Sequence, residues 1–176
     1  MLNEKVTIKS EAVFSEDKKH RYLLFQEWDK SKPKAAILMI TAGLADGVYS
    51  DLTTMLCKNN AAELGYGSMY IVNLFSRTDI VTKSRKDLKA FYDENTDQYI
   101  RIAGEKADTV ILAWGASGTE TVKKRQREVM ELLAPYQEKL RMIADGQGRE
   151  YVHPLCPSVR NGWSLKEIAA AAPESK

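Results

Sequence analysis

The sequence has 176 residues, with 26 basic and 24 acidic side chains, so its formal net charge is only +2. That length suits one domain with a proper core, and an apolar share of 44% is ordinary for a globular protein. So small a charge excess argues against a protein that coats nucleic acid through bulk electrostatics.

Cysteines and apolar runs bear on the compartment. Cys57 and Cys156 lie far apart and form no CxxC pair, which suits a reducing environment and excludes zinc-ribbon and redox motifs. The opening MLNEKVTIKSEA lacks the apolar core of a signal peptide, and no apolar run approaches the roughly 18 residues that span a bilayer. We therefore expect a cytoplasmic protein without a membrane segment.

The chain begins with a predicted β-hairpin. Val6 to Phe14 and Tyr22 to Phe25 have the pattern of two short strands joined by the charged turn SEDKKHR. A polar connection around Pro33 follows, because proline stops any helix there. Residues 1–34 are therefore assigned to a hairpin and its connection.

Four later segments are short and continuously apolar, which is typical of strands buried on both faces of a parallel sheet. They are the segments 35–40, 68–75, 109–114 and 140–144. Capping residues and helical spacing predict a helix in each interval between them. These helices run from 52 to about 64, from 93 to 106 and from 120 to 133.

Alternating strands and helices indicate right-handed βαβ crossovers. The predicted fold is α/β, a three-layer sandwich with a central parallel sheet of about four strands, plus the N-terminal hairpin. One domain covers residues 1–176, with its core at 35–168. WSLKEIAAAA, residues 163–172, is expected to close it with a short helix, and residues 173–176 to form a frayed tail.

Ligands bind open parallel sheets beyond the carboxyl ends of the strands. Four segments fall at such ends, namely 41–46, 73–78, 115–119 and the approach to His153. The candidate set consists of polar side chains from these four segments and of Asp51, which follows the first segment at the start of the next predicted helix. The candidates are Thr41, Asp46, Asp51, Asn73, Ser76, Arg77, Ser117, Thr119 and His153.

Three of these candidates also have a structural interpretation. Asp51 is a good helix N-cap, and that interpretation is the favoured one. Asp46 precedes a glycine and suits an Asx turn as well as a functional carboxylate. Asn73 ends an apolar run, and the paired donor and acceptor of its amide are what a base edge needs, so we favour a binding role.

The remaining motifs are less specific. Gly115 opens GASGT before a helix, which suits a phosphate, but GASGT is neither a GxGxxG nor a Walker loop. His153 precedes a proline and is therefore extended, and a lone histidine is more often structural than catalytic. His153 and Cys156 have a spacing that metal ligands use, but they lack further partners. We expect no metal and no cofactor.

Five stretches occur in a specific order: AVFSEDKKHRYLL, a strand and turn ending in AD, IVNLFSRT, ILAWGASG and HPL. Together they cover about residues 13–155 and resemble a bacterial and phage family named only as domain of unknown function sixteen forty-three. That family usually has Asn-Pro-Ser-Thr-Ala-Asp after its first buried strand. Here the segment 41–46 reads TAGLAD and matches only at Ala45 and Asp46.

Four features are also similar, more remotely, to the uracil-DNA glycosylase superfamily. They are AAILMI followed by TAGLAD, YIVN ending in Asn73, ILAWG with Trp114 and Gly115, and His153 with its proline. The similarity implies the same parallel α/β sandwich, with Asn73 bonding the base and His153 stabilising charge that develops on a carbonyl oxygen. The glycosylase pattern Gly-Gln-Asp-Pro-Tyr-His is absent, and Asp46 lies several residues later than its aspartate.

The resemblance implies a nucleobase-recognising protein that hydrolyses an N-glycosidic bond in DNA or in a nucleotide, with a flipped base as substrate. Asp46 and His153 would be catalytic. The substrate would contact Thr41, Asn73, Ser76, Arg77, Gly115 and Ser117. The alternatives are a non-catalytic nucleotide- or DNA-binding protein, which the TAGLAD departure favours, and a protein-interaction module. The sequence carries no signature of an oligomeric state.

Overall fold

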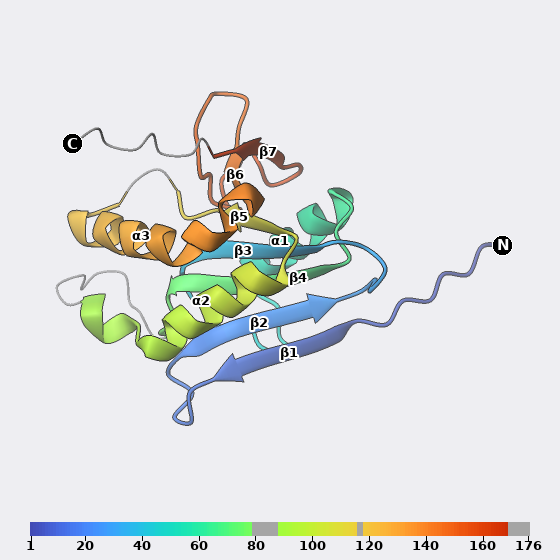
Figure 1. Cartoon of the computed structure of the whole chain (residues 1–176). Helices are drawn as coiled ribbons and strands as arrows, with labels where there is room; N and C mark the ends of the chain where they lie inside the picture. Colours follow the sequence, from blue (N-terminus) through green and yellow to red (C-terminus); the bar gives the residue numbers. More distant parts are fainter. Residues whose placement is uncertain (79–87, 116–117, 169–176) are drawn as a thin grey trace.

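A computed structural model describes residues 1–78, 88–115 and 118–168 of the chain (Figure 1). Within these residues, seven strands form one sheet in the order β1-β2-β4-β3-β5-β6-β7. The strands are β1 Lys9–Phe14, β2 Arg21–Glu27, β3 Lys34–Thr41, β4 Ser68–Phe75, β5 Thr109–Leu112, β6 Leu140–Ala144 and β7 Ser164–Glu167. The helices are α1 Leu52–Glu63, α2 Glu94–Lys106 and α3 Glu120–Leu133, with 3-10 turns η1 Leu88–Phe91 and η2 Ala134–Lys139.

The centre of the sheet is the predicted parallel core. Strands β4, β3, β5 and β6 are parallel neighbours, and Ile37 of β3 lies between Ile71 of β4 and Ile111 of β5. All three isoleucines are fully buried. The mixed α/β class and the positions of these four strands therefore follow the prediction from their apolar runs.

The prediction of about four strands was wrong, because the sheet formed by the described residues has seven. The hairpin does not stand apart from the core: β2 pairs antiparallel with β4, and β1 pairs antiparallel with β2. At the other side, β7 pairs antiparallel with β6. The two edge strands of a four-stranded parallel sheet would have rows of unpaired backbone groups, and the antiparallel strands β2 and β7 pair with these groups.

Elements pack on both faces of the sheet. In β3, Ala36 and Leu38 belong to one hydrophobic cluster, whereas Ile37 and Met39 belong to the other, as alternation along a strand requires. Helices α2 and α3 cover the first face, and α1 with the segment 152–163 covers the second (Figure 1). The core thus holds the carboxyl ends of β3, β4, β5 and β6 along one edge of the sheet.

The short helix expected to begin at Trp163 was also wrong over Ser164–Glu167, because β7 occupies those residues. Ser164 pairs with Ala144 and Leu165 with Ile143, while Leu165 packs into the second cluster beside the buried Trp163. Backbone partners on β6 and this burial outweigh the helix propensity of the segment. Residues 169–172 and the tail expected at 173–176 lie outside the described residues.

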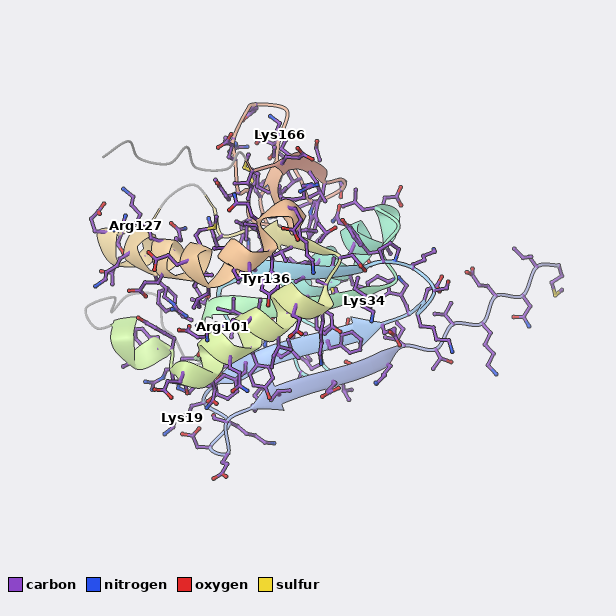
Figure 2. All side chains as sticks on the ribbon, in the orientation of Figure 1. Lys19, Lys34, Arg101, Arg127, Tyr136 and Lys166 are labelled. Atoms are coloured by element: carbon purple, nitrogen blue, oxygen red, sulfur yellow. The ribbon has the colours of Figure 1, made fainter. Side chains whose placement is uncertain are left out.

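Across the described residues, none of the helices has both the length and the apolar character needed to cross a membrane. Charged side chains lie on separate parts of the surface. Figure 2 shows Lys19, Arg127 and Lys166 at different margins of the molecule. This spread agrees with the small net charge of +2.

Candidate functional site

A cavity of about 190 Å³ lies beyond the carboxyl end of β3. The chain passes from β3 to β4 on one side and then to β5 on the other, so this end is the switch point at which such sheets bind ligands. The lining comes from the start of β2, the end of β3 with the loop after it, the start of α1 and the segment after β6. It consists of Arg21, Met39, Thr41, Ala42, Gly43, Asp51, Thr53, Thr54, His153 and Leu155.

Arg21 is a buried cation beside this cavity, with only 2% of its surface exposed. Its Nη1 donates to the Ala45 carbonyl at 2.9 Å and its Nη2 donates to Oδ1 of Asn73 at 3.1 Å. Its Nε has no hydrogen-bond partner among the described residues. Burial lowers the pKa of Arg21, and the negative charge of Asp51 opposes that shift. The cavity is therefore backed by a positive charge that water does not screen.

Asn73 lies behind the cavity rather than in its wall. It is 2% exposed, and its Oδ1 accepts the bond from Arg21. Its Nδ2 donates to the Thr41 carbonyl at 2.8 Å. The amide thus joins the start of β2, the end of β3 and β4. One N–H and one lone pair of the amide stay free of these two bonds.

Asp51 is the carboxylate that lines the cavity. Its Oδ1 accepts from the Thr54 N–H at 2.8 Å, which caps α1 as the sequence predicts. Its Oδ2 lies against Gly43, where an added Cβ would be 2.3 Å away. Only glycine at position 43 therefore leaves room for the carboxylate in this orientation.

Asp46 is held in a turn. Its Oδ1 accepts from the N–H groups of Val48 and Tyr49, both at 2.7 Å. These backbone bonds lower the pKa of Asp46. Asp46 is not among the described residues that line the cavity. The Asx-turn geometry anticipated from the following glycine is present.

His153 is half-buried in the cavity wall. Its Nδ1 accepts from the Leu155 N–H at 3.2 Å. A backbone N–H only donates, so Nδ1 carries no proton and the neutral ring holds its proton on Nε2. Burial lowers the pKa of His153, which favours this neutral form. The imidazole is therefore a hydrogen-bond donor through Nε2.

The segment before His153 is positioned by the end of β5. Gly115, at a φ of 83°, donates its N–H to the Tyr151 carbonyl at 2.6 Å. The ring of Tyr151 stacks on Trp114 with 5.7 Å between centroids. The positive φ at position 115 explains why a glycine follows Trp114, because glycine adopts such a φ without steric cost.

Two predicted site residues lie in a different neighbourhood. The buried Ser76 Oγ is 2.7 Å from Nδ1 of His20 and 2.7 Å from Oγ1 of Thr96. Arg77 places its guanidinium 5.7 Å from the ring centre of Phe91. Neither residue is among those that line the cavity.

Two further candidates follow β5. Thr119 caps α3 by accepting from the Val122 N–H at 3.4 Å. Ser117 lies outside the described residues. No three His, Cys, Asp or Glu side chains in the described ranges gather closely enough to hold a metal ion. The cavity thus unites Thr41, Asp51 and His153, with Asn73 held behind it by Arg21.

Fold and cavity together define a mixed α/β protein with a polar, cation-backed cavity at the carboxyl edge of parallel strands. The family model described as Protein of unknown function (DUF1643) matches residues 21–155, and the chain belongs to this family. Comparison with curated proteins and with solved structures gave no match. The matched region begins at Arg21 and ends at Leu155, both of which line the cavity.

Proposed function

We propose that the cavity binds a nucleobase and that the protein has a uracil-DNA glycosylase-like fold. The size of the cavity carries this proposal: about 190 Å³ is smaller than the roughly 300–1,000 Å³ of sites for drug-sized ligands. It suits a flat base better than a whole nucleotide. Thr41, Thr53 and Thr54 line the cavity, and a threonine hydroxyl supplies both the donor and the acceptor that a base edge requires.

The chemistry proposed is hydrolysis of the N-glycosidic bond. When the bond between C1′ of the sugar and the base nitrogen breaks, the electron pair leaves with the base and charge gathers on a carbonyl oxygen. A neutral His153 donates a hydrogen bond from Nε2 to that oxygen. The unscreened charge of Arg21 favours the same anion. Both contributions grow as the bond breaks, so they lower the barrier.

The carboxylate proposed for this reaction is Asp51 in place of Asp46. Asp51 lines the cavity, and its Oδ2 is not the atom that caps α1. It would stabilise the cationic sugar and accept a proton from the water that attacks C1′. Oδ1 of Asp46 already accepts two backbone N–H groups in a turn.

A second candidate function is binding of a nucleobase or nucleotide without turnover. The observation that favours it is the anchoring of the only two carboxylates of the segment 41–54, since each has an oxygen bound to backbone N–H groups. The segment also departs from the family pattern at 41–44. In this candidate the cavity and His153 bind the base, and Asp51 serves only as the cap of α1.

The test incubates the full chain with single- and double-stranded oligonucleotides carrying uracil and other altered bases, scored for abasic sites. Asp51→Asn is the test variant, because asparagine is also a good N-cap and preserves α1. Asp46→Asn is its matched control. Abasic sites that disappear in Asp51→Asn and persist in Asp46→Asn would support the glycosylase.

The same panel and the free bases are then titrated calorimetrically. Binding without abasic sites, weakened by His153→Ala, would support the non-catalytic candidate. If neither cleavage nor binding of any base is detected, the nucleobase proposal is wrong.

A further inference from the structure

Exposed apolar side chains gather in two segments of the chain. Apart from Leu64, every large hydrophobic side chain exposed in the described residues belongs to one of them. We call residues 1–8 the N-terminal arm and residues 44–55 the apolar rim. Their exposed members are Met1, Leu2, Val6 and Ile8 in the arm, and Leu44, Val48, Tyr49, Leu52 and Met55 in the rim.

The N-terminal arm extends away from the body of the molecule (Figure 1). All of its residues are exposed, with Leu2 at 95% and Val6 at 58%. Pairing of β1 with β2 begins at Lys9, and no strand in the described ranges pairs with the arm. Because no strand pairs with the arm, another surface can cover its apolar side chains without breaking strand pairing in the fold.

The apolar rim spans the loop after β3 and the first turn of α1. Leu44 is 73% and Val48 is 96% exposed. Leu52 and Met55 are three residues apart on α1 and therefore lie on the same face of the helix. Exposed apolar side chains that gather in one segment of the chain are typical of interaction sites.

The charges of the two segments are complementary. The rim carries Asp46 and Asp51 and has no lysine or arginine, so its charged side chains are all acidic. The arm carries Lys5 against Glu4, and Lys9 follows it directly, so residues 1–9 have an excess of positive side chains. An apolar, basic segment is the occupant that an apolar, acidic surface fits best.

The arm does not reach the rim of its own chain. Lys9 pairs with Glu27, and Glu27 pairs with Ser68 at the start of β4, so the arm leaves the amino edge of the sheet. The rim follows the opposite end of β3, a strand of 8 residues. At about 3.3 Å per residue that strand alone is about 26 Å long.

A fully extended arm spans only about 26–29 Å, and it would also have to cross β2 and β4 at about 4.8 Å per strand. We propose that the arm of one copy docks on the apolar rim of a second copy of this chain. The contact joins two different surfaces, so two copies close into a two-fold dimer if they exchange both arms and assemble head to tail if they do not. It does not depend on the nucleobase proposal.

The test measures the mass of the full chain by sedimentation over a range of concentrations. The arm variant is Val6→Asp with Ile8→Asp, and the rim variant is Leu44→Asp with Val48→Asp. All four side chains are exposed, so the variants should keep the fold, as urea denaturation will show. Leu64→Asp is the control for an exposed apolar side chain outside both segments.

We expect wild type and Leu64→Asp to associate equally, and each double variant alone to be monomeric. A mixture of the two double variants should form a heterodimer, because the rim variant still has an intact arm and the arm variant an intact rim. A wild type that is monomeric throughout would overturn the proposal. So would a mixture that stays monomeric, or an arm variant that associates as strongly as wild type.

Discussion

Replacing Asn73 with alanine tests whether the buried amide holds the strand ends together. The change removes a bond of 3.1 Å from the Arg21 guanidinium and one of 2.8 Å to the Thr41 carbonyl. A hydrogen bond to a charged group contributes about 1.5–3 kcal/mol and a neutral one about 1 kcal/mol. We therefore expect the free energy of unfolding to fall by about 3 kcal/mol.

The assay is urea denaturation followed by circular dichroism, with the slope m checked for constancy. Asn60→Ala is the matched control, because Asn60 is also buried and its Nδ2 donates to two carbonyls, of Leu56 at 2.9 Å and Arg160 at 3.1 Å. Neither partner is charged, so its loss should be about 1–2 kcal/mol. If Asn73→Ala costs no more than Asn60→Ala, the role given to the amide is wrong.

Three further predictions concern other parts of the structure. Gly43→Ala should lower the free energy of unfolding by about 1–3 kcal/mol, because the new Cβ would lie 2.3 Å from the carboxylate that caps α1. Gly47→Ala places its Cβ where nothing lies within 4 Å and should be neutral, so equal urea midpoints for the two variants would contradict the prediction. Burial lowers the pKa of His153, so the unfolded chain binds that proton more readily and the free energy of unfolding falls as the pH drops below about 6.5. The urea midpoint should therefore fall less between about pH 7.5 and 5.5 in His153→Gln than in wild type, and an equal fall would refute the assignment. Arg125→Lys should lower the free energy of unfolding by about 2–3 kcal/mol, because that buried guanidinium donates to a β4 carbonyl and an α2 carboxylate. Arg127→Lys on the exposed face of the same helix should change it by less than about 0.5 kcal/mol, and similar losses at both positions would contradict the prediction.

The parallel core could be predicted because burial on both faces leaves a continuous apolar run. The segments at β3 and β4 have that pattern: β4 is buried along its whole length and β3 is buried from Ala35 to Met39. β7 could not be predicted, because Ser164–Glu167 carries a single partly buried leucine and precedes a run of alanines. Its strand conformation comes from the backbone groups that β6 offers, which are far away in the sequence.

The site was predicted in part. Thr41 and His153 were placed at strand ends by topology, and both line the cavity. Arg21 was not predicted, because the rule for parallel sheets points only to the carboxyl ends of their strands. β2 is antiparallel to β4, so the start of β2 lies at the same edge as the end of β4. A charged residue that opens an apolar run, as Arg21 does before YLLF, is the signal that could have found it.

The two aspartates of the loop after β3 show that a helix cap and a functional carboxylate are not exclusive alternatives. A carboxylate has two oxygens, and Asp51 caps α1 with Oδ1 while Oδ2 lies against Gly43 in the cavity wall. The cap therefore orients the side chain and leaves its second oxygen available. Asp46 also bonds backbone N–H groups through Oδ1 alone. What separates the two residues is their position relative to the cavity, and that position follows from Gly43, because the absence of a Cβ there lets the Asp51 carboxylate lie against the loop.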